Sequence, residues 1–379
     1  MVTPSVSPAD RRDWLALHRL PGVGPILFGK LLARFGNPSQ ALAEIAQWRH
    51  ILEQRGDLFR HETVLLDWAG VEKDLLWAEQ PDHTIITLED SCYPPLLQEI
   101  PDPPPVIYVR GNVQVLAMPQ VALVGTRSPS DGGRETARAF AHALASQGWG
   151  ITSGLAYGVD AQAHEGALEA GGITIAVAGT GLDRVYPSRH KALAQRIAEQ
   201  GALVAEYPLG TPPLPTHFPR RNRLISGLSL GTVVVEAAVH SGSLITARMA
   251  VEQGREVFAI PGSIHNPLAR GCHALIRQGA KLVETAQDIW EELASLTQLA
   301  ITISRSSPTI SSVVGSPDEL DSTEQQLLLL MGFNSVGVDN LVDRSGLTAE
   351  KLSSILLGLE LRGYVVAQPG GLYARATRG

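Results

Sequence analysis

The sequence predicts an α/β protein built on a doubly wound, mainly parallel β-sheet, with a small helical domain before the sheet and a winged helix after it. Three observations predict this architecture. Short runs of Val, Ile and Ala alternate with amphipathic helical segments between residues 121 and 293. Apolar residues before residue 80 recur with helical spacing. The segment from residue 324 to 373 combines three helical runs with a hairpin.

The chain has 379 residues, which favours two or three domains over one. We expect a helical domain over residues 1–80, an extended Rossmann-like domain over 81–297, a linker over 298–320 and a winged helix over 321–379. The linker is expected there because the stretch is poor in charge and rich in Ser and Pro.

Two helices joined by a tight turn are predicted near the N-terminus. Trp14, Leu17 and Leu20 have helical spacing, and the turn LPGVGP at residues 20–25 separates them from the next helical run. Such a pair resembles a helix-hairpin-helix unit, whose turn offers backbone amides to one phosphate. A plain helical hairpin with a glycine turn fits the same residues, and the sequence leaves both open.

The central region predicts the strands of the sheet. A Pro-rich connection, PDPPP at residues 101–105, separates strand candidates at 85–88 and 106–109. Six later runs are continuously apolar, as strands buried on both faces are, which predicts parallel pairing. These runs are VALVG, GITSG, ITIAVAGTG, GALVAEYP, TVVVEAA and REVFAIPG. The helices expected between them are Arg134 to Gln147, Asp160 to Ala170, Lys191 to Gln200, Phe218 to Gly227 and Ser243 to Gln253.

Composition predicts a soluble globular protein from a reducing compartment. Hydrophobic residues make up 44% of the chain and charged residues 18%, with a formal net charge of -7. Cys92 and Cys272 lie far apart and in no metal-ligand spacing, so neither a disulfide framework nor a zinc site is expected. Neither an apolar leader nor a run of about 18 apolar residues is present, so we expect a cytoplasmic protein that does not enter a membrane.

In a doubly wound sheet, ligands bind where the carboxyl ends of the strands lead into helix N-termini. The loops at these positions are GTRSPSDGGRE, SGLAYGVDAQAH, GTGLDRVYP and HSGSLITA, whose small residues and hydroxyls suit phosphate oxygens. The fingerprints of NAD sites and P-loops are missing, so no cofactor is expected. Asp160 and His164 share a helix face, but we favour a carboxylate bound to local amides and a packed histidine over a metal site.

Three arginines surround one asparagine after the fourth of these strands, in HFPRRNRLISG at residues 217–227. A guanidinium is a planar fork that fits a phosphate, so Arg220, Arg221 and Arg223 are candidates to contact several phosphates. Four arginines without a catalytic partner, counting Arg127 on the loop after the first strand, favour binding of a polyanion over turnover of a small molecule.

The neighbours of these arginines indicate which polyanion. Asn222 can bond a base edge or lock a loop, and Phe218 can stack on a base, so single-stranded nucleic acid is the favoured ligand. In the other interpretation, one arginine pairs with Glu206 or Glu236, and Phe218 and Leu224 belong to the core.

Taken together, the motifs resemble the DNA-processing protein A family, also called DprA or Smf, over most of residues 85–290. The stretches that carry the resemblance are GTR, SGLAYGVDAQAH, GTGLDRVYP, FPRRNRLISGLS, VVVEAAVHSGSLITA, PGS and GCHALIRQGA. One departure is PPLPTH before the FPRRN stretch, where some members carry a lysine.

The resemblance implies a Rossmann-like domain that binds single-stranded DNA and forms a homodimer, with a small SAM-like helical domain before it. It also implies that the protein protects incoming DNA and loads a RecA-type recombinase during natural transformation, with a single-strand-binding protein as a further partner. The DNA-binding residues that it implies are Arg127, Ser153, Gly154, Phe218, Arg220, Arg221, Asn222, Arg223, Ser241, Gly242 and Ser243.

Other functions stay open at this point. A phosphoribohydrolase-like enzyme or sensor would use the same loops for a nucleotide, but it would carry a PGGxGTxxE-type loop, whereas HSGSLITARMAVE has no carboxylate until Glu252. We therefore favour a protein that is not an enzyme. A purely structural adaptor would leave the arginines unexplained.

In the winged helix, the helix expected at residues 348–362 carries two glutamates against one lysine and one arginine, a balance that suits a protein contact at least as well as a DNA groove.

Overall fold

The structure is a computed structural model, in which the chain forms two compact units, residues 1–305 and 306–379. The described residues are 8–45, 48, 66–293, 327, 336–337, 341, 345, 351–352, 355–356, 359, 365–368 and 372–375. The linker expected over 298–320 lies outside them.

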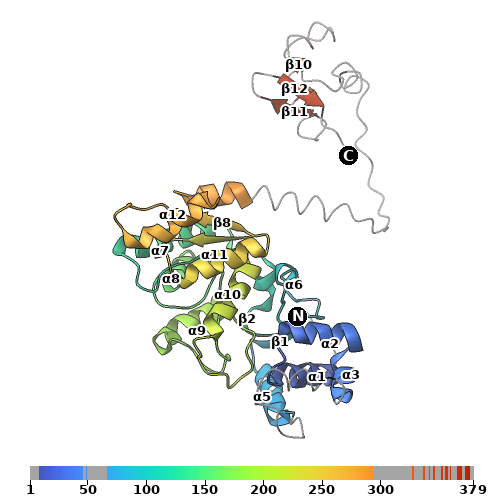
Figure 1. Cartoon of the computed structure of the whole chain (residues 1–379). Helices are drawn as coiled ribbons and strands as arrows, with labels where there is room; N and C mark the ends of the chain where they lie inside the picture. The colour runs from blue at the N-terminus through green and yellow to red at the C-terminus, as the bar shows by residue number, and fades with distance from the viewer. Residues whose placement is uncertain are drawn as a thin grey trace. The chain divides into compact units, whose positions relative to one another are not determined.

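The first unit contains a nine-stranded sheet with the strand order β1-β2-β6-β5-β4-β3-β7-β8-β9. Figure 1 shows its helices arranged around the sheet. Its strands are β1 (His83–Thr87), β2 (Val106–Gly111), β3 (Gln120–Val124), β4 (Gly150–Ser153), β5 (Thr174–Val177), β6 (Ala202–Ala205), β7 (Gly231–Val234), β8 (Glu256–Ala259) and β9 (Lys281–Leu282). Strands β3 to β9 pair in parallel, whereas β1 and β2 are antiparallel and extend the sheet beyond β6. The prediction of a mainly parallel sheet is confirmed.

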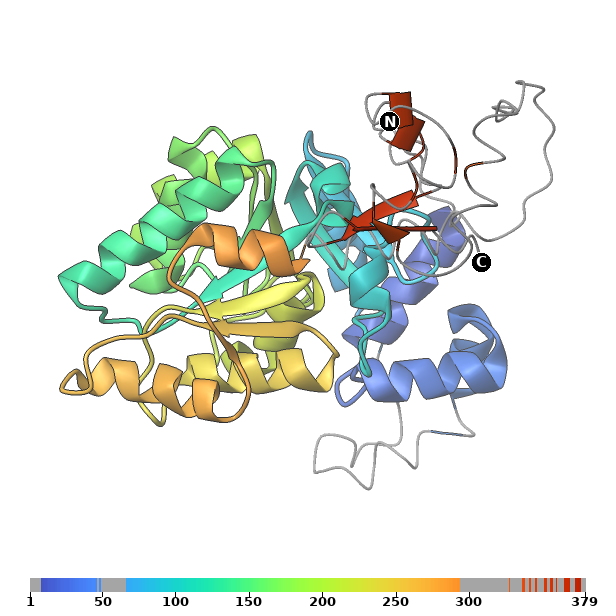
Figure 2. The same ribbon diagram turned by 90° about the horizontal axis from the view of Figure 1, so that it is seen from above.

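Helices cover both faces of the sheet, as a doubly wound fold requires (Figure 2). They are α6 (Pro95–Gln98), α7 (Asp131–Ser146), α8 (Val159–Glu169), α9 (Lys191–Gln200), α10 (His217–Gly227), α11 (Gly242–Glu252) and α12 (Arg270–Arg277), with short 3-10 turns at Val113–Ala117, Ser188–His190 and Pro267–Ala269. Alternate residues of β3 face opposite layers: Val121 and Leu123 pack with α7 and α8, and Ala122 and Val124 belong to the cluster that contains α10 and α11. Every residue of β3 is buried, which explains its unbroken apolar sequence.

The strand order reverses between β3 and β7, because the chain builds outward from β3 to β6 on one side and from β7 to β9 on the other. In doubly wound sheets, such a reversal leaves a crevice at the carboxyl ends of the two central strands. The fold therefore places the loop after β3 and the loop before α11 on either side of one opening.

The N-terminal helices share a hydrophobic core with the sheet. They are α1 (Pro8–Arg19), α2 (Pro25–Phe35), α3 (Pro38–Ala43) and α5 (Trp68–Ala78). Gly22, with a φ of 81°, allows the tight turn between α1 and α2. The buried Asp74 joins the two parts, because it accepts hydrogen bonds from Arg19 Nη1 at 2.9 Å and from Tyr108 Oη in β2 at 2.7 Å. His18 Nε2 lies 2.8 Å from the carbonyl oxygen of Glu206, directly after β6.

The second unit contains a three-stranded antiparallel sheet with the order β10-β12-β11. Its strands are β10 (Val336–Gly337), β11 (Val365–Gln368) and β12 (Leu372–Arg375). Strands β11 and β12 form the hairpin predicted from YVVAQPGGLYA, beside a cluster of buried leucines. Of the charged residues in the predicted helix over 348–362, Glu350, Glu360 and Arg362 lie outside the described residues.

Candidate nucleic-acid interface

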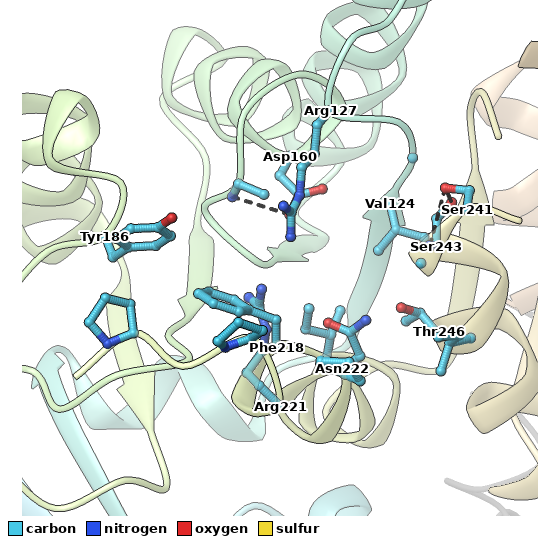
Figure 3. A pocket seen from close by; sticks show the side chains of 18 residues that line it. Val124, Arg127, Asp160, Tyr186, Phe218, Arg221, Asn222, Ser241, Ser243 and Thr246 are labelled. Atoms are coloured by element: carbon cyan, nitrogen blue, oxygen red, sulfur yellow. Dashed lines mark hydrogen bonds between the residues drawn. The ribbon is translucent and has the colours of Figure 1, made fainter. Parts of the chain in front are cut away.

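A pocket of about 540 Å³ opens at the carboxyl ends of the central strands (Figure 3). Helix α10 supplies Phe218, Arg221 and Asn222 to one wall, and Arg127 faces them from the loop after β3. The start of α11 closes the side that carries Ser241. Segments more than 100 residues apart in sequence thus meet at the crevice that the strand order creates.

Arg221 is the buried cation of the pocket. Only 3% of the residue is exposed, and its Nη1 donates to the carbonyl oxygen of Val177 at the end of β5. Its Nε has no partner among the described residues. Burial lowers the pKa of Arg221 to about 10, against the opposing effect of the Asp160 carboxylate, so the guanidinium stays charged at neutral pH. A buried cation with an unused donor is suited to an anion that enters the pocket.

Asp160 is the only acid among the described residues that line the pocket. Its Oδ2 accepts from the amides of Gly154 at 3.1 Å and Ala156 at 3.3 Å, which holds the loop after β4 in place. Burial raises the pKa of Asp160, while Arg221 acts in the opposite direction. The prediction that this carboxylate binds local amides is confirmed.

His164 has a packing role, as predicted. It is fully buried, its Nδ1 lies 2.7 Å from Thr174 Oγ1, and burial lowers its pKa to about 3. Across the described part of the chain, no group of three or more His, Cys, Asp and Glu side chains is placed to hold a metal ion.

Gly154 makes room for the buried guanidinium. A Cβ at this position would lie 2.2 Å from Arg221 Nη1, far inside van der Waals contact. The glycine of the SGLAYG stretch is therefore required by the side chain of Arg221, which comes from a different part of the sequence.

Aromatic side chains form the wall between α10 and the loop after β5. The ring centroid of Phe218 lies 5.4 Å from that of Tyr186, and the Arg127 guanidinium carbon lies 5.8 Å from the Phe218 ring. A side pocket of about 100 Å³ adjoins this wall and is also lined by Gly154 and Tyr157. Exposed aromatic rings beside arginines can stack on unpaired bases.

The N-terminus of α11 provides a third kind of contact. Ser241 caps the helix, and its Oγ lies 2.7 Å from Ser243 Oγ. Gly242 lines the pocket and is exposed, so an anion can approach the first backbone amides of the helix, which have no intrahelical acceptors.

Most of the expected site residues meet in this pocket. The residues that line it are Arg127, Phe218, Arg221, Asn222, Ser241, Gly242 and Ser243. Gly154 lines the side pocket. Ser153 does not line either pocket, because it is buried and its Oγ donates to the carbonyl oxygen of Leu123.

Two of the three arginines on α10, Arg220 and Arg223, do not line the pocket, and their expected contacts with DNA stay a prediction. Arg223 is buried in ion pairs with Glu206 and with Asp102, whose Oδ2 lies 2.9 Å from Arg223 Nε. The interpretation in which one arginine pairs with Glu206 is thus confirmed for Arg223. Arg220 is exposed and extends toward Gly24 in the turn before α2, where an added Cβ would lie 3.5 Å from Arg220 Nη2.

Tyr186 and Thr246 also line the pocket, although no motif in the sequence marks them as site residues. Tyr186 belongs to the GTGLDRVYP loop. An aromatic residue in a loop that follows the carboxyl end of a strand is a pattern from which a base-stacking residue could have been predicted. Thr246 lies one turn inside α11 and is 1% exposed, and its place in the pocket follows only from the packing of α11 beside α10.

Comparison with known proteins gives the family. Residues 84–294, more than half of the chain, match the family model described as DNA recombination-mediator protein A. The chain belongs to this family, DprA. Residues 8–51 match the DprA-like N-terminal HHH domain, and residues 314–371 match the DprA winged helix domain.

Individual DprA relatives agree with this assignment. Protein Smf of Escherichia coli is 44% identical over 378 residues, which cover 97% of this chain and 96% of the relative. The X-ray structure of DNA processing protein A from Streptococcus pneumoniae is similar with a TM-score of 0.63 and 36% identity, over 74% of this chain and 97% of that one. A second DprA structure, from Helicobacter pylori, has a TM-score of 0.51 and 31% identity, over 56% of this chain and 96% of that one, and is described by its single-stranded DNA binding mode.

Helices long and apolar enough to cross a membrane do not occur in the described parts of this DprA-family chain.

Proposed function

We propose that this protein binds single-stranded DNA in the pocket, protects the strand and loads a RecA-type recombinase onto it. The observation that carries the proposal is the buried Arg221, whose guanidinium faces a pocket of about 540 Å³ with Arg127 on the opposite wall. The DNA-binding residues are then Arg127 and Arg221 for phosphates, Asn222 for orientation, Phe218 for stacking, and the start of α11 for a further phosphate.

The aromatic wall supports a preference for single strands. Phe218 and Tyr186 offer ring faces to bases that are not stacked in a duplex. In double-stranded DNA these faces are covered by neighbouring bases, so only the phosphate contacts would remain.

The chemistry of the pocket supports binding rather than catalysis. Asp160 is held by two backbone amides and faces a buried guanidinium, so it is not free to act as a general base. We therefore propose that the protein acts without a cofactor and is not an enzyme.

A homodimer is part of the proposal. Val239 and Val251 are 52% and 65% exposed and line a hollow of about 500 Å³ beside α11 and α12. An exposed apolar patch of this kind is what a second copy would cover.

The free Cys92 and Cys272 support a reducing compartment, and we propose that the protein works in the cytoplasm together with the recombinase and a single-strand-binding protein.

The proposal is tested by fluorescence anisotropy with labelled single-stranded and duplex DNA of equal length across a salt series. We expect tighter binding of the single strand, and a log–log salt slope that becomes shallower by about 0.7 in Arg127→Ala because one phosphate contact is lost. Arg138→Ala is the matched control, since it removes an exposed arginine that pairs with Glu169 and does not line the pocket. Equal affinity for both DNA forms, with no effect of Arg127→Ala, would contradict the proposal.

A further inference from the structure

A second hollow, of about 630 Å³, lies beside α9 and is lined by Val185, the residue before Tyr186. Its lining contains three cations: Arg110 from β2, Arg189 from the 3-10 turn Ser188–His190, and Lys191, the first residue of α9. The remaining lining residues are Val185, Ala192 and Gln195. We call this site the basic hollow.

The cations of the basic hollow are available to a ligand. Neither Arg189 nor Lys191 forms an ion pair with any acid in the part of the chain that the structure describes. Arg110 Nη2 donates to Gln195 Oε1 at 2.6 Å, which orients the guanidinium with a neutral amide and leaves its charge uncompensated. An oriented, uncompensated guanidinium is suited to a phosphate.

The acids closest in sequence already have other partners. Asp183 pairs with Arg184, and its Oδ1 accepts from the amide of Gly210. On α9, the carboxylate of Glu199 accepts from Gln195 Nε2 at 2.9 Å. Because Gln195 is neutral, the charge of Glu199 remains, but three lining cations outnumber this one neighbouring carboxylate, so the hollow keeps an excess of positive charge in a chain whose net charge is negative.

The basic hollow and the DNA pocket share one wall, the segment over residues 185–191. Tyr186 lines the pocket and the side pocket, whereas Arg189, three residues later, lines the basic hollow. Three residues span at most about 11 Å, so the two sites are close enough for one extended strand. The crossing point is aromatic, because Tyr186 and Tyr157 are 50% and 43% exposed and the Tyr157 ring lies 4.9 Å from that of His190.

We infer that the basic hollow binds phosphates of the same DNA strand that occupies the pocket, so that the strand crosses the Tyr186 and Tyr157 rings and continues along α9. This inference rests on the proposed function and extends it: the protein contacts a longer piece of single-stranded DNA than the pocket alone can hold. The ligand is the phosphodiester backbone, without regard to base sequence.

The test compares the full-length parent with Arg189→Ala/Lys191→Ala in anisotropy titrations of two labelled oligothymidylates, one of about 4 nucleotides and one of about 16, which span the range of single-strand site sizes. We expect equal affinity of the two proteins for the short strand. For the long strand, we expect weaker binding by the variant and a salt slope shallower by about 1.4, from two lost phosphate contacts. Arg138→Ala/Lys281→Ala is the control, because it removes the same charge from exposed ion pairs outside both sites and should behave like the parent.

Each other result overturns the inference in a distinguishable way. Equal binding of the long strand by parent and variant shows that the hollow takes no part, or takes only a free anion, while the proposed function stands. If the variant loses affinity equally for the short and the long strand, Arg189 and Lys191 act on the DNA in the pocket and not on a further stretch of the strand. A parent that binds neither strand contradicts the proposed function itself. Thermal unfolding of the variant, expected to match the parent because both side chains are exposed, excludes misfolding as the cause.

Discussion

Gly154 and Arg221 depend on each other at the scale of single residues. The guanidinium occupies the space that a side chain at position 154 would need, and Asp160 binds the amide of the same glycine. The sequence singles out both residues, but it does not show that they touch, because Gly154 directly follows β4 and Arg221 lies on α10, 67 positions later. The two residues meet because the order of the strands in the sheet brings the end of β4 close to α10.

We expect Gly154→Ala to displace Arg221, because the new Cβ would lie 2.2 Å from Nη1. Overpacking of this kind lowers the free energy of unfolding by about 1–3 kcal/mol, and a displaced guanidinium should weaken binding of single-stranded DNA. Chemical denaturation and anisotropy measure the two effects. Gly132→Ala is the control, since its nearest neighbouring atom would lie 4.0 Å away. Unchanged DNA binding in Gly154→Ala would mean that the position of Arg221 is not needed.

At the scale of elements, α10 presents its three arginines to three different environments. Arg221 faces the pocket, Arg223 is buried against Glu206 and Asp102, and Arg220 is exposed. The sequence predicts the helix itself and also the strand before it, because apolar periodicity is local. It does not distinguish the environments of the three arginines, because the partners of Arg223 come from the residue after β6 and from the Pro-rich connection, and the partner of Arg221 comes from the end of β5. Tertiary packing determines which neighbouring segment each arginine of α10 contacts.

We expect Arg223→Ala to destabilise the protein by about 3–5 kcal/mol without changing the salt slope of DNA binding. The reason is that Glu206, 7% exposed, would be left as a buried charge whose partner is gone, while no lining residue of the pocket changes. Burial already raises the pKa of Glu206, and Arg223 opposes that shift. Urea denaturation combined with salt-dependent anisotropy checks both parts, and Arg223→Ala/Glu206→Gln should recover part of the stability. A salt slope that falls with Arg223→Ala would return this residue to the DNA site.

At the scale of the whole molecule, the pocket and the basic hollow belong entirely to the first compact unit. The sequence predicts the helical region, the sheet and the winged helix, since each has its own periodicity. It does not predict that the helices before residue 80 share a core with the sheet, because the contacts of Asp74 with Arg19 and Tyr108 connect positions that no local pattern relates.

A fragment of residues 1–305 should therefore bind single-stranded DNA with the affinity and salt slope of the full chain. The physical reason is that every lining residue of both sites lies before residue 305, and that the fragment keeps the core shared by the helices and the sheet. Circular dichroism checks folding of the fragment, and anisotropy checks binding. A large loss of affinity in a folded fragment would show that the winged helix contributes to DNA binding.

The far edge of the sheet has a consequence for solubility. An exposed edge strand is a template on which strands of other molecules can add, which leads to aggregation. Here the edge strand is β9, which has only two residues, both exposed, and one of them is Lys281, paired with Glu292. So short and charged an edge offers few backbone groups to an incoming strand, and we expect it to disfavour edge-to-edge joining of the sheets of two molecules.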